Sequence, residues 1–270
     1  MLTLKIFLLT NSKLFNFPII AIFMMRAIRD SPVKREILKK LRCREVVSGD
    51  EIAREVKTSR VAVWKHIKEL NNLGYSIIST PKGYTLISEP RKPYPWELDF
   101  ESYYFKEIES TMDVAKELAE KGAKNVFVIA EKQTQGRGRI GRKWSSPEGG
   151  LYFSLILRPK LPLADIDRVR YPVLEALKEG LEDYGLPVEI APEGNIFVKG
   201  KKIAGILVEA EGELDQVKYV IVGVGVNVNN VAPVNGTSMK EELKREVDML
   251  ELTRNLFTKI YQHLSAEAIF

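Results

Sequence analysis

The sequence predicts an α+β protein in two parts, a small helical domain that ends in a β-hairpin and a larger domain built on a mixed sheet. At the front of the chain, apolar residues at helical spacing give way to two short strand-like runs. A proline-rich, charged stretch follows at 89–96. Behind it, short β-rich runs alternate with amphipathic helices, which is typical of an α+β domain on a mixed sheet.

The composition is that of a folded protein with an adequate core and no disulfide. Of the 270 residues, 45% are hydrophobic and 29% are charged. The single cysteine, Cys43, excludes an internal disulfide, so we expect a cytoplasmic protein. His66 and His263 are the only histidines, which leaves too few residues for a zinc site or a Ser-His relay. We therefore predict no metal held by the protein itself.

The first 25 residues form an apolar extension that stands outside the functional argument. Its apolar run at 14–25 is shorter than the roughly 20 residues that a membrane-spanning helix needs, so we predict no membrane association. Two interpretations stay open. Either the translation start was placed too early and the true start is Met24 or Met25, or the extension is genuine and packs against the protein.

Residues 26–88 carry the signals of three helices. Apolar residues at helical spacing predict a helix over 33–41. Ser48 and Ser59 stand where N-caps are expected, directly before a second and a third apolar-periodic run. The third helix should end near Gly74, because glycine is the usual residue after a helix C-terminus.

Two strand-like runs at 76–79 and 84–87 flank a turn and complete this domain. Three helices followed by a hairpin make a winged helix-turn-helix, whose third helix enters the major groove by its N-terminal part. The side chains expected to reach phosphates or base edges are Ser59, Arg60 and Lys65 on the third helix and Lys82 at the wing tip. We expect Val61, Val63 and Trp64 to pack in the core rather than to read bases.

The charge distribution favours a polyanionic partner for this domain. Residues 26–92 contain 16 Lys and Arg against 8 Asp and Glu, whereas the whole chain has a net charge of +5, so the large domain is acidic. A basic front on an acidic body favours DNA. Two alternatives stay open: a solvated basic surface without a partner, and protein contacts, which winged helices also make.

The stretch 89–96 is predicted to be a linker, because its prolines can continue neither a helix nor a central strand. The large domain then occupies 97–270. In it we expect helices at 114–118, 173–181 and 242–264, and strands at 126–130, 151–157, 203–210 and 217–228, the last two forming a hairpin.

The strongest signal lies in the loop between the first two of these strands, QTQGRGRIGRKW at 133–144. Its glycines let the backbone approach a ligand and let N–H groups converge on an anion, while four basic side chains supply positive charge. We therefore predict a site for a polyphosphate or a mixed anhydride, with Trp144 able to stack on a purine. The alternative is a flexible arginine–glycine loop that binds nucleic acid without specificity.

Several motifs in consistent order make the large domain similar to biotin protein ligases. The segment GRGRIGRKWSSPEGGLYFS resembles the family's adenylate-binding loop, and GKKIAGILVE at 200–209 resembles its hairpin with the catalytic lysine. VGVGVNVNN and TSMKEEL resemble the next strand and the segment after it, and Glu109-Ser110-Thr111 the start of the biotin pocket. In the front domain, the segment 51–77 is similar to the repressor-type domain of bifunctional biotin ligases. The resemblance covers nearly all of residues 100–260 and implies a class II synthetase-like mixed sheet with flanking helices.

The resemblance implies a ligase that joins biotin to ATP, releases pyrophosphate, and transfers biotin from biotinyl-5′-AMP to a lysine of a biotin carboxyl carrier protein. It also implies a biotin-responsive repressor that binds operator DNA as a homodimer. Mg²⁺ would bridge the phosphates of ATP. A DNA-binding biotin sensor with impaired or lost transfer is the alternative, and a lipoate-type ligase is a more distant one, against which the arginine-rich loop argues.

The same resemblance implies roles for individual residues. Lys202 matches the catalytic lysine, and Arg139 would hold the biotin carboxylate or the adenylate phosphate. The biotin-binding candidates are Ser110, Thr111, Gln133, Gly136, Arg137, Arg139, Gly205 and Gly223. The ATP-binding candidates are Arg137, Arg139, Arg142, Trp144, Lys202 and Asn227. Without the resemblance, Lys202 would be a solvated turn charge and Ser110 and Thr111 a helix cap.

Three departures from the family pattern stand out. The family's Lys-Trp-Pro-Asn-Asp loop is Ala191-Pro-Glu-Gly-Asn195 here. In the family the final aspartate is thought to orient or deprotonate the acceptor lysine; an amide cannot accept that proton, and Glu193 is the nearby candidate to replace it. The Ser-Thr-Asn entry to the biotin pocket is Ser110-Thr111-Met112, which loses the hydrogen bonds of the amide. Many members also end in an SH3-like domain of about 50 residues, and we expect none here, because the sequence stops at Phe270 after the last predicted helix.

Overall fold

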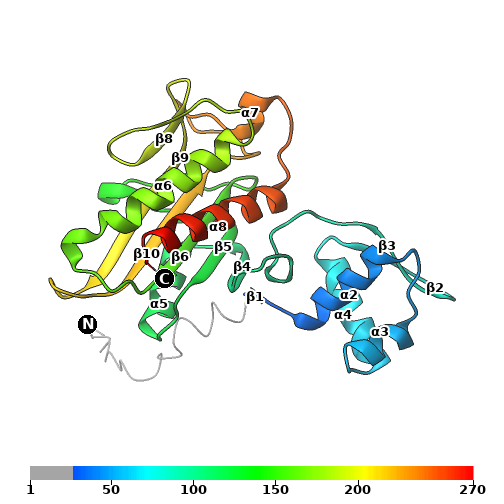
Figure 1. Ribbon diagram of the computed structural model, residues 1–270. Coiled ribbons are helices and arrows are strands. Elements are labelled where there is room, and N and C mark those ends of the chain that lie inside the picture. Colours follow the sequence, from blue (N-terminus) through cyan, green and yellow to red (C-terminus); the bar gives the residue numbers. More distant parts are fainter. Residues whose placement is uncertain (1–26, 270) are drawn as a thin grey trace, which may run out of the picture.

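The computed structural model describes residues 27–269, so the apolar extension expected at 1–25 lies outside the described residues. A small helical domain stands beside a larger domain in which helices cover a sheet (Figure 1). Within residues 27–269, no helix is long and apolar enough to cross a membrane.

The front domain is the expected winged helix-turn-helix. Its elements are α2 (Pro32–Cys43), α3 (Gly49–Glu55), α4 (Arg60–Asn72), β2 (Ser76–Thr80) and β3 (Gly83–Ser88). Each helix begins at a serine whose side chain accepts a hydrogen bond from the backbone N–H three residues on, at Ser31, Ser48 and Ser59. These caps satisfy orphan donors and set where each helix starts.

Within residues 27–269, the large domain is built on one eight-stranded sheet, in which only the β4–β5 pair is parallel. In spatial order its strands are β1 (Ile28–Arg29), β4 (Ser102–Ile108), β5 (Val126–Gln133), β6 (Leu151–Leu157), β10 (Val217–Val226), β9 (Lys201–Gly212), β8 (Asn195–Val198) and β7 (Val188–Ile190). This mixed sheet confirms the predicted fold class, and the paired β9 and β10 are the expected hairpin. Strands β1, β4, β7 and β8 were not predicted.

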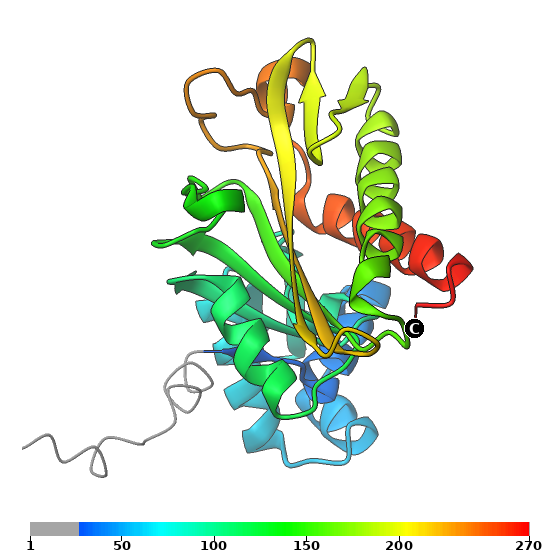
Figure 2. The same cartoon turned by 90° about the vertical axis from the view of Figure 1, so that its left-hand side faces the viewer.

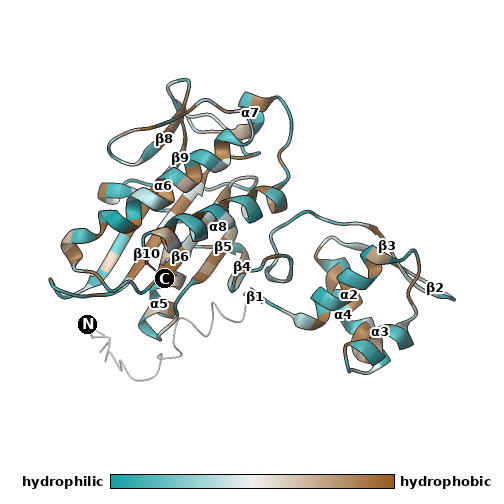
Figure 3. Ribbon diagram, in the orientation of Figure 1, coloured by the Kyte–Doolittle hydropathy of each residue, from teal (hydrophilic) through white to brown (hydrophobic). Residues whose placement is uncertain are grey.

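Helices cover both faces of the sheet, and the alternation of strand side chains explains which helix covers which face. Phe127 and Ile129 of β5 pack in the same cluster as α6 (Asp167–Glu182) and α8 (Met249–Ala266). Val128, the residue between them, packs instead with α5 (Thr111–Glu120) on the opposite face. Figure 2 shows α6 and α8 on one side of the sheet and α5 on the other, and Figure 3 shows the apolar colour concentrated along the strands.

The expectation of a single helix over 242–264 was wrong. The chain instead forms a short helix, α7 (Met239–Leu243), turns, and begins α8 at Met249. Lys244 adopts a left-handed backbone conformation, with φ of 57°, which ends the first helix. Asp248 then caps α8 by accepting a hydrogen bond from the N–H of Glu251 at 3.0 Å.

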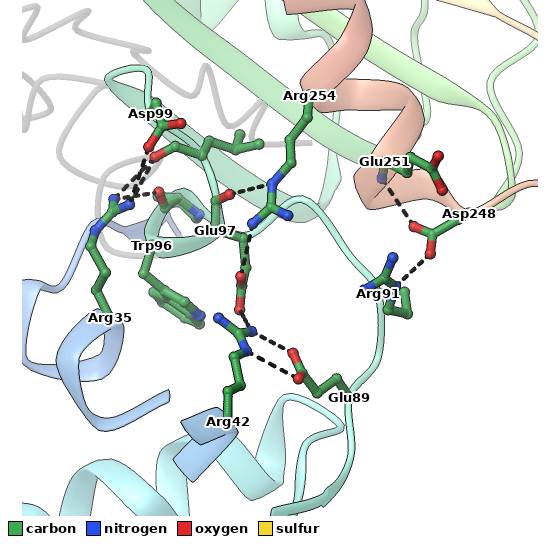
Figure 4. A network of polar contacts seen from close by, with 12 residues as sticks. Arg35, Arg42, Glu89, Arg91, Trp96, Glu97, Asp99, Asp248, Glu251 and Arg254 are labelled. Atoms are coloured by element: carbon green, nitrogen blue, oxygen red, sulfur yellow. Dashed lines mark hydrogen bonds and ion pairs between the residues drawn. The ribbon is translucent and has the colours of Figure 1, made fainter. Parts of the chain in front are cut away.

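The stretch predicted as a linker lies against both domains. Residues 93–98 are buried, and Pro95–Glu97 form a short 3₁₀ turn. The carboxylate of Glu97, 2% exposed, accepts hydrogen bonds from Arg42 of the front domain at 2.6 Å and from Arg254 of α8 at 3.2 Å. Figure 4 shows these arginines meeting at Glu97. The stretch therefore forms part of the interface between the domains rather than a free tether.

Candidate functional site

The sheet carries a cleft of about 330 Å³ at the ends of β5, β9 and β10. The β5–β6 loop, the start of α5 and the segment before β8 complete its walls. The structure brings most of the sequence-predicted ligand residues together in this lining: Ser110, Thr111, Gln133, Arg137, Arg139, Arg142, Trp144, Lys202, Gly205 and Gly223. Residues separated by more than a hundred positions in the sequence thus share one cavity.

Two glycines on neighbouring strands form the seat of Trp144. Gly205 of β9 and Gly225 of β10 are paired in register. A methyl group at Gly225 would lie 2.4 Å from the indole, and one at Gly205 would lie 3.2 Å from it. The ammonium of Lys202 stands 4.8 Å from the centre of the indole ring. The aromatic wall of the cleft and its lysine are therefore placed by the same strand pair.

Polar side chains at one end of the cleft are tied to one another. The hydroxyl of Ser110 accepts the N–H of Met112 at 3.3 Å, so Ser110 is the N-cap of α5, as the simpler alternative held. The backbone N–H and the hydroxyl of Thr111 both donate to Oε1 of Gln133, at 2.8 and 3.1 Å. The Gln133 amide donates to Ser146 at 2.9 Å. Ser110 keeps its hydroxyl hydrogen, and Gln133 keeps one amide hydrogen, to offer a ligand.

Met112 makes the wall beside these groups apolar. Its side chain is buried, and a methyl group at Gly223 would lie 2.5 Å from its sulfur. The glycine therefore makes room for the methionine. Met112 stands where the family pattern has an asparagine, and its packing against Gly223 accommodates this change.

Basic side chains gather over the other end of the cleft. Arg137 pairs with Asp113 at 2.8 Å, whereas Arg142 and Lys143 are exposed. Ile140, between Arg137 and Arg142 in the sequence, is 89% exposed. Its backbone is left-handed, with φ of 55°, which is strained for a β-branched residue. The loop is thus held open to solvent with its cations at the rim.

Lys202 lies among these cations. Burial lowers the pKa of its ammonium below the usual lysine value, and repulsion from Arg142 and then Arg139 acts in the same direction. The carboxylate of Glu193 opposes that shift. A bound anion would relieve the repulsion among the cations, so the site favours polyphosphate ligands.

Two predicted ligand residues, Gly136 and Asn227, support the cleft without lining it. A methyl group at Gly136 would lie 2.5 Å from the Ser146 hydroxyl, so this glycine serves a close chain contact. Asn227 is buried and accepts a hydrogen bond from Asn230 at 3.1 Å. Gly225, in contrast, lines the cleft and was absent from the predicted set. Its two-residue spacing from Gly223 places both on one face of the strand, a signal that could have revealed it.

The candidate DNA-binding residues lie on the outer side of α4 and on the wing. Arg60, Lys65 and Lys82 are exposed. Ser59 caps α4, because its hydroxyl oxygen accepts a hydrogen bond from the N–H of Ala62 at 3.1 Å. The expectation that Val61 and Trp64 pack in the core was wrong, because they are 64% and 51% exposed.

Helical geometry explains that exposure. The buried face of α4 consists of Val63, Ile67 and Leu70, and Val61 and Trp64 fall on the side away from it. Val63 therefore packs in the core as expected, while its two apolar neighbours share the exposed face with the basic residues.

A winged helix-turn-helix domain combined with a cationic, glycine-floored cleft defines a class of proteins that joins a DNA-binding fold to an anion-binding site. Residues 104–227 match the biotin/lipoate A/B protein ligase family, and residues 33–85 match an HTH domain. The chain therefore carries a domain of the biotin/lipoate A/B protein ligase family, preceded by a helix-turn-helix domain.

Individual relatives agree with this assignment. The bifunctional ligase/repressor BirA of Bacillus subtilis is 40% identical over 198 residues, which cover 68% of this chain and 61% of the relative. BirA of Escherichia coli is 30% identical over 210 residues, 74% of this chain and 65% of the relative. The chain thus matches less than two thirds of the length of these curated relatives. The biotin protein ligase from Aquifex aeolicus, solved with biotin and ATP, superposes with a TM-score of 0.51 at 28% identity, over 61% of this chain and 70% of that one.

Proposed function

We propose that this protein is a biotin protein ligase that forms biotinyl-5′-AMP from biotin and ATP and transfers the biotinyl group to a lysine of a biotin carboxyl carrier protein. One observation carries the proposal: the glycine-rich loop, Lys202 and the indole of Trp144 converge on one cleft in the sheet. The match of the large domain to the ligase family and the similarity to bifunctional relatives support it. The presence of a single cysteine is consistent with a cytoplasmic location of the protein.

In the first step a carboxylate oxygen of biotin attacks the α-phosphate of ATP, and the bond to pyrophosphate breaks. Both reactants are anions, so positive charge must already stand where they meet. Lys202 and Arg139 are the proposed catalytic groups, with Arg137 and Arg142 beside them and Trp144 against the adenine. Mg²⁺ would arrive with the ATP phosphates, since no cluster of three metal-ligating side chains occurs in the described part of the chain.

Biotin would lie at the end of the cleft where Ser110, Thr111 and Gln133 meet. The free hydrogens of Ser110 and Gln133 would reach its ureido oxygen, and Met112 would line its apolar side. Gly205 and Gly223 would act indirectly, by seating Trp144 and Met112. Gly136 and Asn227 would hold the loop and the strand end that carry these contacts.

The front domain would make the ligase a biotin-responsive repressor. The exposed Arg60 and Lys65 on α4 and Lys82 on the wing form a basic surface that suits operator DNA. Helix-turn-helix proteins commonly read paired half-sites, so we expect a homodimer on DNA.

A second candidate function is a DNA-binding biotin sensor with impaired transfer. One observation favours it: Asn195 stands where the family has an aspartate, and an amide does not take up a proton. This protein would form and retain biotinyl-5′-AMP, bind its operator in response, and leave the carrier unmodified.

One experiment separates the two candidates. The chain is incubated with biotin, ATP and Mg²⁺, with and without a carrier domain, and pyrophosphate release and carrier biotinylation are measured together. Pyrophosphate with labelled carrier is the expected result for a ligase. Retained biotinyl-5′-AMP with unlabelled carrier would indicate the sensor, and no pyrophosphate under either condition would refute both.

A further inference from the structure

Glu193 is the one carboxylate among the described residues that line the cleft. Five basic side chains share that lining: Arg137, Arg139, Arg142, Lys143 and Lys202. Glu193 is exposed, at the side where β8 approaches β9, so a group arriving from outside the protein can reach it. The substrates of the first step are anions, so this carboxylate contributes nothing to their binding.

The loop that carries Glu193 is fixed from two sides. Arg139, from the β5–β6 loop, donates a hydrogen bond to the main-chain oxygen of Glu193. Arg170 of α6 donates to the main-chain oxygen of Pro192 at 2.9 Å. These contacts hold the backbone on both sides of the Glu193 side chain, so its position does not depend on a bound ligand.

Asn195 orients the carboxylate itself. Its amide nitrogen donates to Oε1 of Glu193 at 3.0 Å. Its amide oxygen lies 3.3 Å from where a methyl group on Gly205 would stand, so the side chain spans from the cleft floor to Glu193. The asparagine that replaces the family's aspartate is thus a hydrogen-bond donor to another carboxylate.

Hydrogen bonds and nearby positive charges favour the ionised form of Glu193. Its own backbone N–H and then the Asn195 amide lower the pKa of Glu193, and the charges of Arg139 and Lys202 add to this. Arg170, on α6, and Arg142, on the β5–β6 loop, are the other cations nearby. An adenylate in the cleft would engage these cations with its phosphate and leave the exposed carboxylate available.

We propose that Glu193 is a catalytic residue of the transfer step, which binds the ammonium of the acceptor lysine and receives its proton. The inference rests on the proposed ligase function. The acceptor ammonium passes one proton to Glu193, and its nitrogen attacks the acyl carbon of biotinyl-5′-AMP. A C–N bond forms, the C–O bond to the phosphate breaks, and AMP leaves with that electron pair. The nitrogen then loses a second proton to solvent, which leaves the amide. Glu193 releases its own proton to solvent and returns to the carboxylate form.

The test uses Glu193→Gln in the full chain, because glutamine keeps an oxygen that accepts from Asn195 but carries no charge. Glu189→Gln is the matched control, an exposed glutamate on the adjoining strand β7 that does not line the cleft. We expect E193Q to slow carrier biotinylation at neutral pH by about a hundredfold, the lower range for removal of a general base. E189Q should transfer at the wild-type rate.

Two further readouts distinguish this role from a structural one. Hydroxylamine, a nucleophile that is neutral at pH 7, should trap the biotinyl group equally well with E193Q and wild type. The transfer deficit of E193Q should also narrow as the pH rises toward about 10, where an acceptor lysine loses its proton unaided.

The possible results distinguish a failure of this inference from a failure of the proposed function. Transfer by E193Q at the E189Q rate, or an equal loss of transfer and hydroxylamine trapping, would overturn the inference. A wild-type chain that forms biotinyl-5′-AMP but never labels the carrier would overturn it too, while supporting the sensor. A wild-type chain that forms no adenylate would refute the proposed function, and this inference with it.

Discussion

At the scale of single residues, the shape of the cleft depends on the positions of its glycines. Trp144 lies against β9 and β10 because Gly205 and Gly225 leave the space that its indole occupies. Its ring nitrogen is buried and has no hydrogen-bond partner in the described structure. Burial of an unpaired donor costs free energy, so the packing of the indole against the two glycines has to offset that cost.

Gly225→Ala should therefore displace the indole. A methyl group 2.4 Å from the ring cannot be accommodated without movement, and such overpacking costs about 1–3 kcal/mol. We expect a lower free energy of unfolding in urea and a higher KM for ATP. The comparison that decides the cause is a double-mutant cycle with Trp144→Ala, in which G225A should cost little once the indole is gone. Equal cost in both backgrounds would show that the strand, not Trp144, is strained.

Lys202 gives a prediction for pH. Its pKa lies below the usual lysine value because of burial, so its charge is lost earlier as the pH rises. If that charge stabilises the first transition state, kcat/KM for ATP in pyrophosphate release should fall at a pH below about 10.5. Lys202→Arg should move this alkaline limb upward, since arginine stays protonated. An unmoved limb in K202R would assign it to another group.

At the scale of elements, α4 shows both how far the sequence pattern reaches and where it stops. Periodicity predicted the helix and its Ser59 cap. It did not say which apolar residues face inward, because that depends on which side of the helix α2, α3 and β2 pack against. Val61 and Trp64 consequently lie on the outer face with Arg60 and Lys65.

That outer face leads to a prediction for Trp64→Ala. Because the side chain is 51% exposed, we expect a small change in stability, within about 1 kcal/mol, but a marked loss of operator affinity. Lys65→Ala should weaken binding to all sequences and lower the salt dependence by about one ion. Filter or fluorescence titration at several salt concentrations measures both. A W64A domain that unfolds easily would instead give Trp64 a structural role.

The strands and helices of the large domain were predictable in proportion to how local their causes are. The apolar alternation of β5 and the run of β6 marked them in the sequence. Strands β7 and β8 have three and four residues and exist through pairing with each other and with β9, which no local pattern shows. The break between α7 and α8 depends on the left-handed backbone of Lys244, a conformation that a lysine in the sequence does not predict.

The same distinction applies to the cleft. The loop at 133–144 and Lys202 were found because their residue types state their chemistry. The hydrogen bond between Asn195 and Glu193, and the seats of Trp144 and Met112, depend on tertiary contacts between separate elements. The sequence showed the substitution in this loop, and the structure shows what the substituted residue does.

At the scale of the whole molecule, the front domain is joined to the large domain at two places. The chain passes through β1, which pairs with β4 at the edge of the large sheet, before it enters the front domain, and it returns through residues 89–101. The winged helix-turn-helix is therefore inserted between two neighbouring strands of one sheet. Such a double connection restricts the orientation of the domain more than one linker would.

Glu97 is the charge on which this junction depends. Besides Arg42 and Arg254, it accepts the hydroxyl of Tyr75 at 2.7 Å, and that hydroxyl accepts the Trp96 indole N–H at 3.0 Å. Burial, followed by the hydrogen bond to Glu97, raises the pKa of Tyr75 well above its usual range, so the phenol stays a donor. Contacts from the front domain and from α8 thus end on one buried carboxylate of the linking stretch.

Glu97→Gln should loosen the two domains from each other. The change leaves Arg254 without its carboxylate partner and weakens the hold on Arg42, which keeps Glu89 as a second partner. Both arginines are partly exposed and can turn to water, so we expect a loss of about 1–3 kcal/mol rather than the larger penalty of a fully buried pair. By calorimetry we expect one unfolding transition for the wild type and two for E97Q, with the front domain melting first. Glu101→Gln, an exposed neighbour, is the control. If E97Q and E101Q unfold alike in one transition, the two chain crossings and the remaining contacts, such as those of Arg35 and Tyr94, couple the domains without Glu97. Operator binding should then be insensitive to Glu97.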